Sequence, residues 1–172
     1  MSTKRYVITQ GEHRAVAEPD AVISTLLGSC VACCLWDPEV GVGGMNHMLL
    51  ASSGRGNSMC NLAGVNAMEL MINDMLKLGA LRGRLRAKAF GGARMISGLS
   101  DIGPKNAEFV MSFLEQEGIA CQSSSLGGSQ ARHVLFTPST GAAKVKVQSA
   151  DVPEPAPQPA PVPQKGNDLE LF

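Results

Sequence analysis

The sequence predicts an α+β fold, a layered α/β sandwich, from three observations. Short apolar segments separated by turn residues fill the first fifty positions. Two later segments repeat apolar residues at helical spacing, and a run of short strand-like segments closes the domain. Because strands and helices do not alternate regularly, we do not expect a doubly wound βαβ sheet.

Four strands are expected in the first fifty residues. They read RYVIT, AVISTLL, VACCLW and VGGMNHML, and turn sequences such as EPD and DPEVG lie between them. Side chains alternate across a strand. The third segment should therefore present Cys30, Ala32 and Cys34 on one face and Val31, Cys33 and Leu35 on the other.

Residues 61–79 repeat apolar side chains at the helical period, which predicts a helix. Gly79 suits the position just past its end. The expected buried stripe is Leu62, Val65, Met68, Ile72, Met75 and Leu76. A second helix is expected from Pro104 to Gly118. Strands are expected at RLRAKAF before it and at IACQSS, RHVLF and AKVKVQ after it.

Composition changes near residue 150, which indicates one folded domain over 1–150. Residues 151–166 are proline-rich and are expected to form an extended, disordered linker. Residues 167–172, NDLELF, resemble a short acidic and hydrophobic tag for docking on another protein, and the alternative is a disordered end without a binding role. Leu169, Leu171 and Phe172 are its expected anchors.

Charge and cysteine content narrow the functional classes. Lys+Arg and Asp+Glu number 15 each, which argues against nucleic acid as a partner. Apolar stretches are shorter than the roughly 20 residues of a membrane helix, and no apolar leader follows the N-terminus, so membrane insertion is not expected. A cytoplasmic location is predicted, where the five cysteines stay reduced. No nucleotide-binding motif occurs, and we expect no cofactor.

Cysteine spacing leaves several interpretations of Cys30 open. Cys30 and Cys33 form one C-x-x-C pair, but a structural zinc site usually needs two such pairs. A redox pair normally opens a helix, whereas this pair lies in a strand pattern. Packing is the expected role of Cys33, Cys34, Cys60 and Cys121, since free cysteine behaves as a small hydrophobe.

Cys30 differs because "TLLGSC" places it after a glycine and a small residue. Gly28 permits backbone conformations closed to other residues, and with Ser29 it would present the thiol and nearby N–H groups. His47, in "GGMNHM", is a suitable base if the two side chains meet in space. His13 and His133 lie in polar stretches and are expected to be solvated.

The segment STLLGSCVACCLWDPEVGVGGMNHMLL resembles the CheD family of chemoreceptor glutamine deamidases. The resemblance continues through GVNAMELMINDMLKLGALRGRLRAKAFGGARM, IGPKNAEFVMSFLEQEGI, LGGSQARHVLFTPSTG and KVKV. It covers roughly residues 5–148. The family's fold is a layered sandwich related to the catalytic domain of bacterial cytotoxic necrotizing toxins.

The resemblance implies a catalytic triad. Cys30 is then the nucleophile and His47 the base. Thr25 is the third member, and Ser24 is the alternative because the family's spacing leaves a one-residue ambiguity. The two point to opposite faces of a strand, so only one of them can serve. Ser29, Gly28 and nearby backbone N–H groups would stabilise the oxyanion.

The resemblance also implies the substrate and partners. Glutamine side chains on chemoreceptor cytoplasmic helices would be hydrolysed to glutamate with release of ammonia. A CheC-type phosphatase is a further expected partner, and a monomer is expected. The alternative is a non-catalytic chemotaxis adaptor that binds receptors or such a phosphatase.

Overall fold

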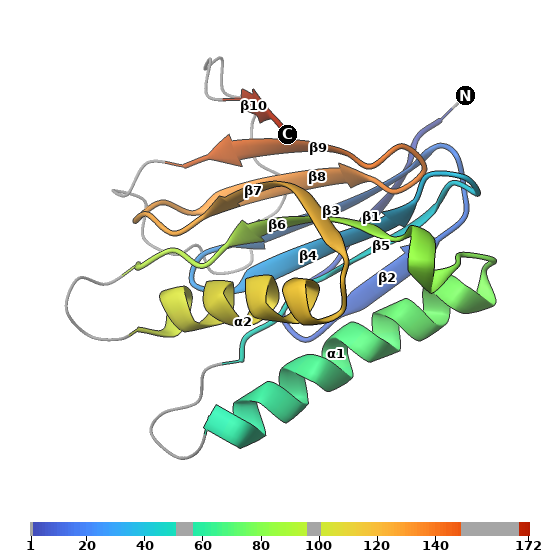
Figure 1. Cartoon of the computed structure of the whole chain (residues 1–172). Helices are drawn as coiled ribbons and strands as arrows, with labels where there is room; N and C mark the ends of the chain where they lie inside the picture. The colour runs from blue at the N-terminus through green and yellow to red at the C-terminus, as the bar shows by residue number, and fades with distance from the viewer. Residues whose placement is uncertain (1, 51–56, 96–100, 149–168) are drawn as a thin grey trace.

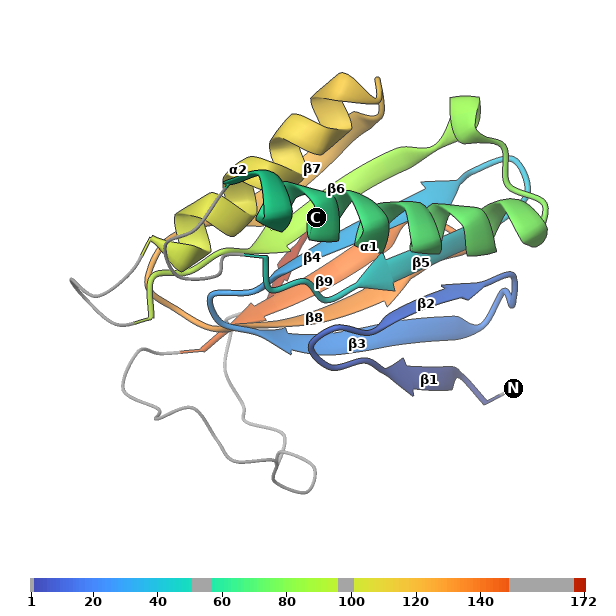
Figure 2. The same cartoon turned by 90° about the horizontal axis from the view of Figure 1, so that it is seen from below.

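The computed structural model describes residues 2–50, 57–95, 101–148 and 169–172. Its architecture has three layers: a first sheet, a second sheet, and a pair of helices (Figure 1). Figure 2 shows both helices lying across the second sheet. The predicted α+β layered sandwich is therefore confirmed.

The first sheet contains five strands in the order β1-β3-β8-β9-β10. Their bounds are β1 Lys4–Val7, β3 Ala21–Leu27, β8 Arg132–Thr137, β9 Ala142–Val147 and β10 Leu169–Leu171. β1 runs parallel to β3, and the other neighbours are antiparallel.

The second sheet also contains five strands, in the order β2-β5-β4-β6-β7. Their bounds are β2 His13–Val16, β5 Val42–Asn46, β4 Val31–Asp37, β6 Arg86–Gly91 and β7 Ala120–Leu126. β6 and β7 are parallel, whereas β2, β5, β4 and β6 pair antiparallel. The chain crosses from the first sheet to the second between β3 and β4.

The helices are α1, Asn57–Lys77, and α2, Ile102–Gln116, with a short 3-10 turn at Arg82–Arg84. Both pack on the second sheet, α1 over β5 and β2 and α2 over β4, β6 and β7. At their contact, a Cβ on Gly64 would lie 2.4 Å from the Phe109 ring, so the absence of a side chain allows the helices to approach. Within the described residues, neither helix is long and apolar enough to cross a membrane.

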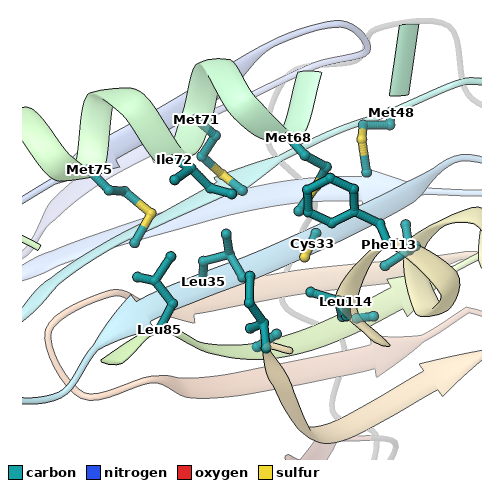
Figure 3. Packing of buried hydrophobic residues seen from close by; sticks show 14 of the residues in the cluster. Cys33, Leu35, Met48, Met68, Met71, Ile72, Met75, Leu85, Phe113 and Leu114 are labelled. Carbon is teal, nitrogen blue, oxygen red and sulfur yellow. The ribbon is translucent and has the colours of Figure 1, made fainter. Parts of the chain in front are cut away.

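Two hydrophobic clusters fill the spaces between the three layers. The helix-side cluster lies between the helices and the second sheet, where methionines of α1 point toward Cys33 and Leu35 (Figure 3). The inter-sheet cluster contains Ile23, Trp36, Phe90 and Phe136. Burial of such side chains contributes about 1.5–3 kcal/mol each to folding before the entropy cost is subtracted.

β4 is the strand that belongs to both clusters. Val31, Cys33 and Leu35 lie in the helix-side cluster. Cys30, just before β4, lies with Ala32 and Cys34 in the inter-sheet cluster. The predicted alternation of the cysteine-rich segment is confirmed.

Other predictions were wrong or incomplete. β2 and β10 were missed. The stripe of α1 holds at Met68, Ile72 and Met75, but Leu62 and Val65 are exposed, while the unpredicted Met71 is buried. The predicted linker at 151–166 lies outside the described residues.

Candidate active site

The candidate residues come from three neighbouring segments. Thr25 belongs to β3 in the first sheet, Cys30 lies just before β4, and His47 follows β5 in the second sheet. All three are buried, with 2%, 8% and 7% of their surfaces exposed. The site therefore lies at the end of the inter-sheet layer, where the chain crosses between the sheets.

A two-way backbone bridge draws the cysteine and histidine segments together. Val31 N–H donates to Met48 O over 3.0 Å, and Met48 N–H donates to Val31 O over 2.7 Å. Val31 and Met48 both face the helix-side cluster. Since strand side chains alternate, the preceding residues Cys30 and His47 face the other way, as diagonal neighbours on the inter-sheet side.

The Thr25 hydroxyl contacts His47 directly. Its Oγ1 lies 2.7 Å from Ile8 O and 2.7 Å from His47 Nδ1. A hydroxyl has one proton, and a carbonyl oxygen can only accept. The proton therefore goes to Ile8, and the hydroxyl oxygen accepts a hydrogen bond from Nδ1–H. This assignment leaves Nε2 of His47 as the nitrogen with a free lone pair.

The surroundings of His47 favour its neutral form. Burial lowers the pKa of His47 below its usual value, and the Glu12 carboxylate opposes part of this shift. Backbone bonds fix the residue between the strands: His47 N–H donates to Glu12 O, and Gly11 N–H donates to His47 O. A buried, oriented, neutral imidazole can accept a proton near neutral pH.

The other candidate side chains are not brought into this group. Ser24 and Thr25 alternate on β3; Ser24 lies opposite Leu135 on the outer face, whereas Thr25 lies opposite Val134, which belongs to the inter-sheet cluster. His133 pairs with Leu26 on that outer face. His13 Nε2 lies 2.7 Å from Asp74 Oδ2 of α1, on the surface.

Gly28 lies close to the segment that follows β6. The expectation of a glycine-only backbone conformation there is wrong, because its φ lies outside the left-handed region. A Cβ at Gly28 would instead lie 3.2 Å from Met95 Cγ. Gly28 O also accepts a hydrogen bond from Ala93 N–H, so the turn before Cys30 packs closely against the segment after β6.

Asn106 of α2 ties this turn to the histidine segment. Its Nδ2 donates to Ser29 O over 2.9 Å, and its Oδ1 accepts from Leu50 N–H over 3.0 Å. Asn106 is fully buried. One amide thus spans the residue before Cys30 and the segment that follows His47, which fixes their separation.

The glycine pair after β6 lies against the cysteine backbone. Gly91 and Gly92 both have positive φ, and Gly92 N–H donates to Cys30 O over 2.9 Å. A Cβ on Gly91 would lie 2.2 Å from the same oxygen. Only glycine tolerates both the conformation and the approach, so the "GG" of "FGGARM" helps to hold Cys30 in place.

Gln10 is a site residue that the sequence did not reveal. Its Oε1 lies 4.0 Å from Cys30 Sγ, from the turn between β1 and β2. Its side chain is exposed, so a carboxamide can reach the thiol from solvent. Nothing in a turn sequence such as "TQGEH" indicates which distant side chain it contacts.

The remaining described cysteines have different surroundings. Cys33 and Cys34 are fully buried, and burial raises the pKa of each thiol above its usual range. Cys121 is half-buried, and burial raises its pKa as well. The side chain of Cys60 lies outside the described residues. No group of three His, Cys, Asp or Glu side chains that could hold a metal ion occurs among those described.

Solved structures give weak matches. A hypothetical protein YfiH from Bacillus licheniformis aligns with a TM-score of 0.44 at 14% identity, over 66% of this chain and 49% of that one. Neisseria meningitidis protein NMB0706, of family-model DUF152, gives 0.42 at 9% identity, over 68% and 52%. This chain thus spans about half the length of each of these two proteins, and we conclude nothing from similarity at this level.

Sequence relatives are much closer. "Probable chemoreceptor glutamine deamidase CheD 1" of Ruegeria sp. is 52% identical over 143 residues, covering 83% of this chain and 76% of that one. The Acidiphilium cryptum and Agrobacterium fabrum proteins named "Probable chemoreceptor glutamine deamidase CheD" are 46% and 47% identical. They cover 98% and 99% of this chain, and 94% and 98% of their own lengths.

The family model described as CheD chemotactic sensory transduction matches residues 48–147, beginning directly after His47. The alignments with the Acidiphilium cryptum and Agrobacterium fabrum proteins leave at most 2% of this chain uncovered, so they include the segment that carries Thr25, Cys30 and His47. On both grounds, this chain belongs to the CheD family.

Proposed function

We propose that this protein hydrolyses glutamine side chains of chemoreceptors to glutamate, with Cys30 as nucleophile. The names of its relatives support the reaction class. The observation that carries the proposal is the Thr25 hydroxyl, which bonds Ile8 O and His47 Nδ1 while Cys30 lies on the same side of the second sheet as His47.

Activation of the thiol is the first step. A free thiol is only a few per cent ionised at neutral pH, so it needs a base. His47 Nε2 takes the proton of Cys30, and the thiolate attacks the carboxamide carbon of the substrate. Thr25 accepts from Nδ1–H, which orients the ring and stabilises the imidazolium that forms.

The remaining steps conserve atoms and protons. The tetrahedral intermediate collapses, its C–N bond breaks, and the imidazolium returns the proton to the leaving nitrogen, which departs as ammonia. A thioester remains on Cys30. His47 then takes a proton from water as the water oxygen attacks the thioester carbon. The C–S bond breaks, the imidazolium returns its proton to the departing thiolate, and glutamate leaves.

The oxyanion is stabilised by donors around the turn before Cys30. We assign this role to backbone N–H groups near the thiol, with Ser29 as a contributor and Gly28 as the residue that lets the turn pack closely. Asn106 and the Gly91–Gly92 pair act as positioning residues, because they hold the backbone on either side of the thiol.

Contact between Gln10 and the thiol supports a carboxamide substrate. The Gln10 side chain carries the same chemical group as the proposed substrate, and it reaches Cys30 from solvent. A glutamine exposed on a receptor's cytoplasmic helix would approach by the same route and displace it. The proposal includes a cytoplasmic, monomeric enzyme with a CheC-type phosphatase as a second partner.

The test is peptide mass spectrometry of a purified chemoreceptor cytoplasmic fragment after incubation with the protein. We expect glutamine-to-glutamate conversion at specific positions and its loss in Cys30→Ala. Cys34→Ala is the matched control, since this cysteine faces the same layer but is fully buried. Receptor binding with no conversion by the wild-type protein would favour the non-catalytic adaptor.

A further inference from the structure

The end of the described chain is built into the first sheet. β10 pairs antiparallel with β9, with Glu170 opposite Val145 and Leu171 opposite Lys144. The ladder continues one residue further, where Phe172 N–H donates to Ala143 O over 3.0 Å and Ala143 N–H donates to Phe172 O over 3.4 Å. Figure 1 shows β10 as the outermost strand beside β9.

Phe172 connects this edge strand to the second sheet. Its ring meets the fully buried Phe90 of β6 edge-on, with centroids 5.6 Å apart. It packs against the inter-sheet cluster, whereas Leu171 is 75% exposed. Phe172 is therefore the residue that anchors the end segment on this chain's own domain, and the role of Leu171 as an anchor on another protein stays a prediction.

Lys88 supplies a polar contact at the same place. This lysine is buried on β6, and burial lowers its pKa. Its Nζ lies 5.4 Å from the centre of the Trp36 ring and donates to Phe172 O over 2.5 Å. Leaving a buried ammonium without an acceptor is costly, so the Phe172 carbonyl satisfies a group that is buried when the end segment is docked.

Glu170 is the acidic residue of the end segment. It lies opposite Val145, whose side chain belongs to the inter-sheet cluster, so Glu170 and Phe172 lie on the same side of the sheet. Burial lowers the pKa of Arg132, and the Glu170 carboxylate opposes part of this shift. The contacts that hold the segment are those of Phe172 with Phe90 and Lys88 and the backbone pairing with β9.

We propose that the edge of β9, with Lys88 and Phe90, is a peptide-binding site for an extended segment that carries phenylalanine at the position of Phe172. Residues 169–172 are its resident ligand, tethered through residues 149–168. Backbone bonds to a sheet edge provide affinity, and the pockets for alternate side chains provide specificity. Such a ligand can dissociate and be replaced by a free peptide of the same pattern.

The first experiment uses the full chain with Phe172→Ala and measures amide exchange by NMR. Ala143 N–H bonds to Phe172 O, so its exchange should become at least about tenfold faster once the segment is released. Leu171→Ala is the matched control and should leave it unchanged, because this side chain is exposed. Unchanged Ala143 exchange in Phe172→Ala would overturn the proposal.

The second experiment adds the synthetic peptide NDLELF to the Phe172→Ala chain. Tethers give effective concentrations in the millimolar range, so a segment that stays docked should bind with a Kd below about 1 mM when free. The peptide should restore Ala143 protection, NDLELA should not, and Lys88→Met should weaken the effect. Fast exchange at saturating NDLELF would show that no separate binding site exists.

Discussion

Cys30 and Cys34 lie on the same face near one strand, yet the two ends of the inter-sheet layer give them different chemistry. Cys30 lies 4.0 Å from the Gln10 carboxamide, at the end of the layer where the Thr25 hydroxyl contacts His47. Cys34 lies mid-strand beside Lys88, fully buried, and burial raises the pKa of its thiol well above the ordinary value despite the lysine. We propose that His47 as a base, rather than a nearby cation, makes Cys30 the reactive thiol.

The largest effect is expected for the base. His47→Ala should lower the deamidation rate by about 10²–10⁴-fold, which is the usual contribution of a general base. His13→Ala is the control, because His13 pairs with Asp74 on the surface. The initial deamidation rate of each variant is measured on a receptor fragment. Equal losses of activity in His47→Ala and His13→Ala would contradict a specific role of His47 as the base.

Alkylation tests the contrast between the thiols directly. Iodoacetamide should modify Cys30 at least about 10²-fold faster than Cys34 in the folded protein, since only thiolates react and Cys34 is kept protonated by burial. Peptide mapping over time gives both rates. Comparable alkylation rates for Cys30 and Cys34 in the folded protein would contradict the account. In denatured protein, the difference between the two rates should disappear.

Substitutions at Thr25 and Ser24 test which of the two is the third member of the proposed triad. Thr25→Val keeps the shape but removes the hydroxyl that fixes the His47 tautomer, and we expect activity to fall about 10–100-fold through kcat. Thr25→Ser should retain most activity, and Ser24→Ala should stay within about twofold of wild type. A greater loss in Ser24→Ala than in Thr25→Val would reverse the assignment.

The smallest expected effect concerns pH. The base form of His47 is the neutral one, and burial lowers its pKa, so the acidic limb of kcat/KM should lie below the usual histidine value of about 6.5. Glu12 raises this pKa, so Glu12→Gln should move the limb to lower pH. A shift of the acidic limb to higher pH in Glu12→Gln would show that a group other than His47 controls it.

The sequence predicted β4 well because both of its faces are buried, so alternation alone assigns each cysteine to a layer. It missed β2 because an edge strand with only β5 beside it carries a mixed polar pattern. The stripe of α1 failed at its first turns, where Leu62 is exposed. Periodicity describes a helix face but not how far a neighbouring layer extends along it.

The candidate site could be predicted only in part from the sequence. Motifs pointed to Cys30 and His47, but the choice between Ser24 and Thr25 depends on which face of β3 meets the second sheet. Asn106 lies 77 residues from its acceptor Ser29, a contact that no local pattern encodes. The sequence left two interpretations of the end segment open, a docking tag or a disordered end, and only the pairing with β9 reveals its place on this chain.

The most direct test of the central claim, that Cys30 and His47 act as one unit, is a double-mutant comparison of deamidation rates on the same receptor fragment. Residues of one catalytic unit are strongly non-additive: once the nucleophile is removed, removing the base costs little more. We predict equal residual rates for Cys30→Ala and Cys30→Ala/His47→Ala. A further loss in the double variant as large as that of His47→Ala alone would contradict the account.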